Sequence, residues 1–421
     1  MNLSTENTLL LYCVQTRITK DTLDYIKGLQ SLSLDWEEVL RFAFSNDIAP
    51  LLYHNLKKIQ ESHFIPQEVV DRLRKAYYGN LAKNMYIYGE LKRILDVFRE
   101  EEIEVIVLKG ASLAETVYGN VGLRCMNDID LLVKKEVLDR SDELMAELGY
   151  ISDESRHSKD WYRKNHRHLA PFLSQDNKIK IEIHHDIIPP ENPFRIDIRK
   201  SWDRAQSNVI GDINTLVLSP EDLIVHLCLH SFYLQPLKKG LRNLVDISQV
   251  VRFYGERINW DRIIREAHEG NFTNFIYYPL CLARDILGME VRREIFDALK
   301  TGSNIGLFED YLLGQITKKN VLLRDHSSSI IIPDNQRLRH TLCKELLRET
   351  HVRNKLRSLL KIIFLPRTES SEKSSQTSIQ KLSCFFCLVL HISKLIFKLC
   401  YCSSKSMIKC IFHKTVVKLA R

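Results

Sequence analysis

Residues 124–133 read Arg124-Cys125-Met126-Asn127-Asp128-Ile129-Asp130-Leu131-Leu132-Val133. From Asp128 onward polar and apolar side chains alternate, which is typical of a β-strand with one face on a core. Asp128 and Asp130 are two positions apart, so both carboxylates project from the same face of that strand. Two adjacent carboxylates repel each other, and a cation between them relieves the repulsion. Mg²⁺ suits this arrangement, because it binds one or two carboxylates and completes its shell with water and phosphate oxygens.

A third acid lies on a later predicted strand. Residues 168–173 and 178–184 have strand-like patterns, and the turn residues at 175–177 predict a hairpin between them. Isoleucines occupy one face of the second run, whereas Lys180, Glu182 and His184 occupy the other. If this strand lies beside the first, three acids can hold the two metal ions used in phosphoryl or nucleotidyl transfer. The predicted catalytic and metal-binding residues are Asp128, Asp130 and Glu182.

A turn of small residues precedes the aspartates. Residues 104–108 form a short apolar run, as in a buried strand, which ends at Lys109-Gly110-Ala111-Ser112 before a predicted helix over 111–118. Exposed amides at a helix start can hold triphosphate oxygens. We therefore expect the nucleotide to contact Lys109, Gly110 and Ser112, with Arg124 as a phosphate clamp.

Helical patterns flank this block on both sides. Residues 67–101 have apolar side chains at helical spacing and predict one long helix, and Asp35 or Ser33 is expected to cap an earlier one. Residues 138–148 predict a helix that stops at Gly149. Ser219 and Pro220 predict another helix start, after which the helical period continues to about residue 360.

The predicted fold is therefore α+β. Its parts are a helical N-terminal subdomain (1–101), a mixed-sheet α/β core (102–216), a helical C-terminal subdomain (217–366) and a basic linker with an amphipathic tail (367–421). The net charge of +8 belongs to the tail, since residues 373–421 carry +9 and the other 372 residues carry −1. The body is not basic, so no sequence-specific nucleic-acid binding is expected. The scattered cysteines and the lack of a visible export signal predict a cytoplasmic protein.

The tail contains an apolar segment, 382–402, with a narrow polar stripe at His391, Lys394 and Lys398. It has no uninterrupted apolar run long enough to span a bilayer. Two interpretations remain open: an interfacial helix at the surface of a membrane, and a helix that docks on its own domain or on a partner. A zinc site built from Cys384, Cys387, Cys400, Cys402 and His413 is a weaker alternative, because the intervening residues are apolar.

A second metal hypothesis concerns His226 and His230. They are four positions apart on a predicted helix, a spacing that can chelate zinc. Asp246 is the only evident third ligand. Histidines that simply face a helix surface are the competing interpretation.

Residues 107–114 and 124–133 together resemble the DNA polymerase β-type nucleotidyltransferase superfamily. More closely, the chain resembles a bacterial family of uncharacterised nucleotidyltransferases, whose members carry Leu-Lys-Gly and Arg-x-Met-x-Asp-Ile-Asp-Leu-Leu-Val segments. Over residues 35–366 further matches to that family are Glu182-Ile183-His184, Ser219 to Asp222, His230 and Leu241-Arg242. The superfamily's usual Gly-Ser pair stands here as Gly110-Ala111-Ser112, and its third acid, often Asp, is Glu182.

The resemblance implies a nucleotidyltransferase-type core and an enzyme that uses Mg²⁺, with Mn²⁺ as the alternative ion. The enzyme would bind ATP or another NTP and move its NMP to an unknown acceptor, using Asp128, Asp130 and Glu182. The alternative is a catalytically degenerate binding or scaffold protein, attached to a membrane or a partner through its basic tail. A histidine-based metallohydrolase is a third hypothesis.

Overall fold

The computed structural model describes residues 5–300, apart from 16–19, 29–33, 59–64 and 235–239. The predicted tail features, including segment 382–402, therefore lie outside the described residues. The chain opens with five helices: α1 (Thr5–Cys13), α2 (Lys20–Gly28), α3 (Trp36–Ser45), α4 (Ala49–Leu56) and α5 (Gln67–Glu100). Asp35 caps α3 by accepting a hydrogen bond from the Glu38 amide at 3.1 Å.

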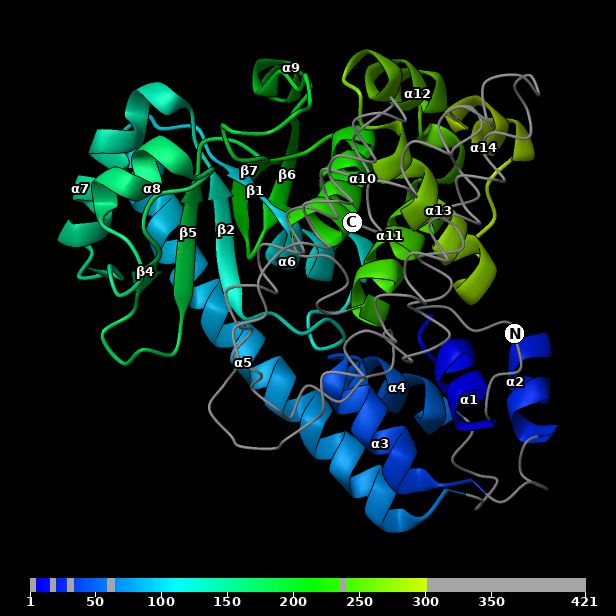
Figure 1. Ribbon diagram of the computed structural model, residues 1–421. Helices are drawn as coiled ribbons and strands as arrows, with labels where there is room; N and C mark the ends of the chain where they lie inside the picture. The colour runs from blue at the N-terminus through cyan, green and yellow to red at the C-terminus, as the bar shows by residue number, and fades with distance from the viewer. Residues whose placement is uncertain (1–4, 16–19, 29–33, 59–64, 235–239, 301–421) are drawn as a thin grey trace, which may run out of the picture.

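Helix α5 is the predicted long helix, and it packs in two different places. Its first turns, with Val70 and Leu73, pack among α1–α4, whereas Leu91 and Phe98 near its end pack on the sheet. Figure 1 shows α1–α4 gathered at the beginning of α5, well away from the strands. Gly79 does not interrupt the helix.

The central sheet has seven strands in the order β3-β4-β5-β2-β1-β7-β6. Strand β2 is parallel to β5 and antiparallel to β1, and β1 is parallel to β7, so the sheet is mixed. The strands are β1 (Ile106–Val107), β2 (Asp128–Leu132), β3 (Ile151–Ser152), β4 (Phe172–Leu173), β5 (Lys180–His184), β6 (Gln206–Ile210) and β7 (Ile213–Val217). The predicted α+β class is confirmed.

Short helices connect the strands. They are α6 (Lys109–Ser112), the π-helix η3 (Leu113–Val117), the 3₁₀ turn η4 (Lys135–Val137), α7 (Leu138–Glu147), α8 (Lys159–Asn165) and α9 (Ile198–Asp203). As expected, α7 ends just before Gly149, which has a left-handed backbone with φ +83°.

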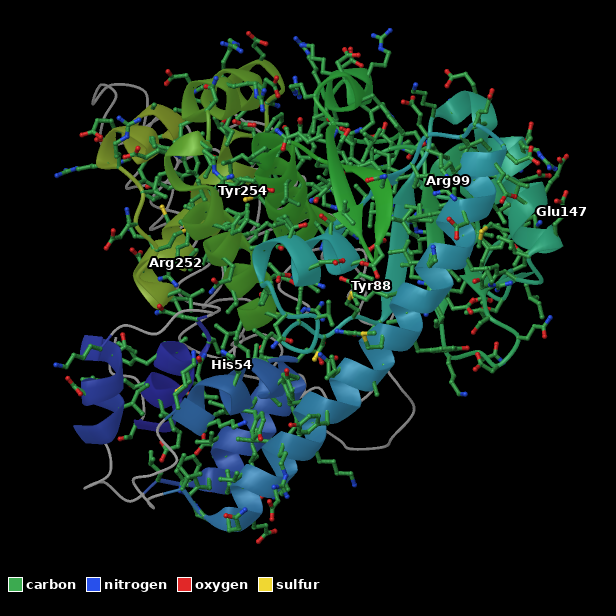
Figure 2. All side chains as sticks on the ribbon, turned by 180° about the vertical axis from the view of Figure 1, so that it is seen from behind. His54, Tyr88, Arg99, Glu147, Arg252 and Tyr254 are labelled. Carbon is green, nitrogen blue, oxygen red and sulfur yellow. The ribbon has the colours of Figure 1, made fainter. Side chains whose placement is uncertain are left out.

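The two faces of the sheet pack against different helices. Ile129 and Leu131 of β2 join one core cluster with α5 and α7, while Leu132 joins a second cluster with the C-terminal helices. Seen from behind, α5 lies in front of the strands (Figure 2). The aspartates share the face of Leu132, so they point toward the C-terminal helices.

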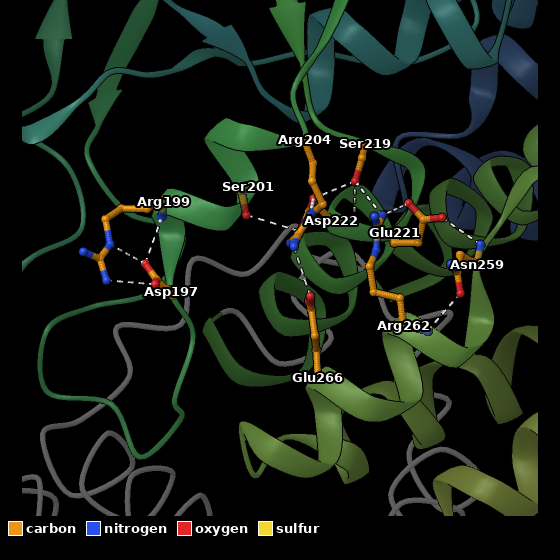
Figure 3. A network of polar contacts seen from close by, with 10 residues as sticks. All are labelled: Asp197, Arg199, Ser201, Arg204, Ser219, Glu221, Asp222, Asn259, Arg262 and Glu266. Atoms are coloured by element: carbon orange, nitrogen blue, oxygen red, sulfur yellow. Dashed lines mark hydrogen bonds and ion pairs between the residues drawn. The ribbon is translucent and has the colours of Figure 1, made fainter.

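The C-terminal helices are α10 (Pro220–Leu229), the π-helix η5 (His230–Leu234), α11 (Gly240–Tyr254), the 3₁₀ turn η6 (Gly255–Arg257), α12 (Trp260–Glu269), α13 (Thr273–Leu287) and α14 (Arg293–Leu299). The Ser219 hydroxyl caps α10 by accepting the Asp222 amide hydrogen bond at 3.3 Å, as predicted. An ionic network then fixes α10 to its neighbours (Figure 3). In it, Arg204 donates to Asp222 of α10 and to Glu266 of α12.

The predicted strands are longer than the observed ones, and three strands were not predicted. Strands β6 and β7 form a hairpin whose turn residues, Gly211 and Asp212, both have positive φ. This is the two-residue turn that favours tight hairpins. The hairpin matters for the sheet, because β7 pairs with the edge of β1 that lies away from β2.

Candidate active site

Strands β2 and β5 bring the acids together. Their parallel register places Asp128 opposite Lys180, Asp130 opposite Glu182, and Leu132 opposite His184. The predicted adjacency of the two strands is therefore confirmed. Asp130 and Glu182 are both buried, while Asp128, at the start of β2, is partly exposed.

Asp130 has two cationic or polar partners. Both of its carboxylate oxygens lie 3.2 Å from the Lys109 ammonium, and Oδ1 lies 2.8 Å from Nε2 of His184. Burial alone raises the pKa of Asp130, but Lys109 and His184 lower it more, so this pKa lies well below its usual range. Asp130 is thus an ionised carboxylate in a closed environment.

Glu182 is surrounded by nitrogen atoms. Its Oε1 lies 2.5 Å from the Lys180 ammonium, and its Oε2 lies 3.4 Å from Nε2 of both His168 and His184. Burial raises the pKa of Glu182, while the hydrogen bond of His184 and the charge of Lys180 bring it well below its usual range. Glu182 therefore also carries a negative charge.

Asp128 behaves differently from the other two acids. Burial, followed by the negative charges of Asp130 and Glu182, raises the pKa of Asp128. No ion pair joins its carboxylate to another of the described residues. A cation near Asp128 would relieve this repulsion.

The donor atoms fit a divalent cation. Among the described residues, one oxygen each of Asp130 and Glu182 and one ring nitrogen of His184 lie within 4.8 Å of one another. Nδ1 of His168 donates to the Leu169 carbonyl oxygen at 2.6 Å, so the lone pair on Nε2 of the neutral ring faces Glu182. A cation between that lone pair and the carboxylate would satisfy both. Asp128 lies outside the three-residue group, and its role as a ligand stays a prediction.

The turn after β1 delivers Lys109 to Asp130. The Leu108 amide donates to the Asp130 carbonyl oxygen at 2.9 Å, and Lys109 then adopts a left-handed backbone with φ +39°. Such a conformation is strained for a lysine and is often kept for function. At Gly110 a Cβ atom would lie 3.2 Å from Nη1 of Arg124 and 3.3 Å from the Met126 side chain, so a larger residue would have to push these side chains aside. Ser112 is buried in the same turn.

Arg124 is held by Asp246 of α11. Nε and Nη2 of its guanidinium donate to the two carboxylate oxygens at 2.9 and 2.8 Å, and the Tyr118 hydroxyl donates to Oδ1 at 2.7 Å. Nη1 remains directed toward Gly110. The clamp role of Arg124 stays a prediction, with Nη1 as the nitrogen that would serve it.

The hypothesis of a zinc site at His226 and His230 needed Asp246 as the third ligand. The carboxylate of Asp246 instead pairs with Arg124. The two rings are nearly parallel, with centroids 6.3 Å apart, and within residues 5–300 as described they join no cluster of metal-ligating groups. Burial, and next the charge of Lys109, bring the pKa of each well below its ordinary value. Both histidines therefore lie neutral beside the acids.

Sequence reasoning did not assign His168 or Arg167 to the site. His168 pairs antiparallel with His184, which brings residues 166–168 beside the acids. The predicted hairpin at 175–177 did not contain this information. The register of Phe172 with Ile181, carried outward, places residue 168 opposite residue 185, and a one-residue shift in the pairing brings it opposite His184 instead.

Comparison with known proteins places the chain in a family. Residues 33–288 match the family described as uncharacterised nucleotidyltransferase. No curated protein matches the chain.

Two solved structures are similar to parts of the chain. The antibiotic-resistance factor ANT(2'')-Ia has 14% identity and a TM-score of 0.30, over 41% of this chain and 87% of that one. JHP933 from Helicobacter pylori has 17% identity and a TM-score of 0.25, over 57% of this chain and 98% of that one. At such scores neither structure bears on the function. The family match covers more than half of the chain, and the protein is therefore a member of the uncharacterised nucleotidyltransferase family.

Proposed function

We propose that this nucleotidyltransferase moves an NMP from an NTP to an acceptor hydroxyl, amine or phosphate, with a divalent cation held between β2 and β5. The observation that carries the proposal is the pairing of Asp130 with Glu182 in register, with Nε2 of His184 within reach of both carboxylates. Lys109 and Lys180 already pair with these two acids, and what supports a metal ion is that Asp130, Glu182 and His184 offer three ligand atoms within 4.8 Å of one another.

The cation is Mg²⁺ or Mn²⁺. Carboxylate oxygens suit both ions, whereas an imidazole ligand suits a transition metal better than Mg²⁺. The ligands of the proposal are Asp130, Glu182 and His184, and Asp128 extends the set toward solvent. When bound, the cation polarises phosphate oxygens and neutralises charge that develops during transfer.

In the transfer, the acceptor atom forms a bond to the α-phosphorus. The bond between the α-phosphorus and the oxygen that links it to the β-phosphorus breaks, and pyrophosphate leaves with that electron pair. The acceptor loses its proton to a base. Glu182 is a poor base because its pKa is low, so its role here is to hold the cation. Lys109, Gly110 and Ser112 bind the phosphates from the β1–α6 turn.

The test is transfer of label from α-labelled NTP to small molecules of a cell extract, with Mg²⁺ or Mn²⁺. Asp130→Asn is expected to lower the rate by about 10³-fold, since it removes a ligand charge. Glu147→Gln is a matched control, because Glu147 is exposed on α7, away from the acids.

Equal transfer by the wild type and the Asp128→Ala/Asp130→Ala double variant would refute the proposal. Titration of Mn²⁺, followed by its paramagnetic resonance signal, gives a second reading that needs no acceptor. The wild type should bind the ion, and Asp130→Asn should bind it much more weakly.

A further inference from the structure

Two arginines are buried in the described part of the chain, and they differ in whether their guanidinium groups have partners. Arg124 and Arg167 are each 7% exposed. Arg124 has both oxygens of Asp246 as partners. Arg167 makes no side-chain hydrogen bond or ion pair within that part of the chain, and its Nε is fully buried without a partner. A buried guanidinium without an acceptor is costly, so its retention calls for an explanation.

The backbone of Arg167 is firmly placed. Its carbonyl oxygen accepts hydrogen bonds from the amides of His185, at 2.9 Å, and Asp186, at 3.2 Å. The next residue, His168, pairs with His184 and faces Glu182. The segment is therefore anchored beside the end of β5, where the acids lie.

The guanidinium of Arg167 interacts electrostatically with the acids but forms no ion pair with any of them. Burial lowers the pKa of Arg167, and the charges of Glu182, Asp130 and Asp128, in that order, raise it. These charges are close enough to act on the guanidinium, but none of the carboxylates is within ion-pair distance.

Other buried nitrogens of the described residues also lack a hydrogen-bond partner. Both ring nitrogens of His226 are buried without a hydrogen bond, and so is Nδ1 of His166. The charges of Lys109 and Arg167 both contribute to the lowered pKa of His226 on α10 and of His230 in η5, so the four side chains interact electrostatically. The missing partner must supply several acceptor oxygens and negative charge.

A phosphate chain meets that requirement. A guanidinium matches two phosphate oxygens through parallel hydrogen bonds, which an ammonium cannot do. We propose that Arg167 is a substrate-binding residue whose guanidinium holds the triphosphate of the NTP opposite the carboxylates. The inference rests on the proposed function, because it takes an NTP as the ligand.

The experiment is calorimetric titration of the full chain with tripolyphosphate and with NTP in the presence of Mn²⁺. Arg167→Met keeps the length of the side chain and removes its charge. It should weaken tripolyphosphate binding by about 10- to 100-fold, the range for hydrogen bonds to a charged group. Arg167→Lys should recover only part of the loss, because it lacks the fork of donors. Arg199→Met is the control, since Arg199 is exposed and pairs with Asp197 (Figure 3).

Thermal unfolding separates binding from a structural role. Because Arg167 has no partner to lose, Arg167→Met should keep or raise the Tm; a large fall in Tm would overturn the inference. Equal tripolyphosphate binding by wild type, Arg167→Met and Arg167→Lys would also overturn it and leave the proposed function intact. If the wild type binds neither tripolyphosphate nor NTP with Mg²⁺ or Mn²⁺, the proposed function itself fails. An Arg167→Met variant that does not fold counts as such a fall.

Discussion

On one face of the sheet, Ile129 and Leu131 of β2 and Ile181 of β5 pack against α5; on the other, Asp130 and Glu182 of the same strands lie buried among nitrogen atoms. The apolar face is complete, because Ile129, Leu131 and Ile181 are each at most 1% exposed and belong to one apolar cluster. The polar face is not, since several of its buried nitrogens lack partners within the described residues. The contrast teaches that one face is built for stability and the other for a ligand.

The most severe way to test the contrast is Leu131→Ala, next to Asp130 on β2. Leu131 is fully buried, so the change should lower the free energy of unfolding by about 3 kcal/mol, within the usual 2–5 kcal/mol for such truncations. Denaturant unfolding measures the loss. Transfer per folded molecule should stay near that of the wild type, and a variant of normal stability with lost activity would contradict the division between the faces.

A smaller effect is expected for His184→Gln on the polar face. His184 donates to or shares a cation with Asp130, and loss of such a group lowers activity or metal affinity by about 10- to 100-fold. The neighbouring variant His185→Gln is the matched control, because the His185 ring makes no contact with an acid. Mn²⁺ affinity and label transfer are the measurements, and equal losses in both variants would contradict a specific role for His184.

The smallest expected effect is a gain, for His226→Leu. The change removes a buried ring with two unpartnered nitrogens, which should raise the free energy of unfolding by about 1 kcal/mol. Burial, and then Lys109 and His184, lower the pKa of His226 in the folded protein, so below pH 6.5 the unfolded chain binds the extra proton. The free energy of unfolding of the wild type therefore decreases as the pH falls.

The gain from His226→Leu should accordingly be larger at pH 5 than at pH 7.5, as measured by denaturant unfolding at each pH. A variant that is less stable than the wild type at both values would show that the ring is a structural element of the polar face.

Local patterns predicted much of this molecule. Helical spacing predicted α5, and alternation predicted which side chains of β2 and β5 share a face. The cap of α10 followed from Ser219 and Pro220. Each of these features depends on residues close together in the chain.

Long-range pairings could not be predicted in this way. Arg124 and Asp246 are 122 positions apart, and nothing local indicates that they meet. The same holds for the pairing of His168 with Glu182, and for the burial of Arg167 without a partner. In contrast, the β6–β7 hairpin had a local signal at Gly211-Asp212 and was still missed.

The long helix α5 has a further consequence for dissecting the chain. Its 34 residues extend about 50 Å, from the N-terminal helices to the far side of the sheet. A fragment that begins at residue 102 would lack this cover, and the isoleucines of β2 and β5 would meet water and neighbouring molecules. Such a fragment should aggregate rather than fold. A piece of this protein that is to be expressed by itself should therefore include α5, which belongs to the folding unit of the sheet.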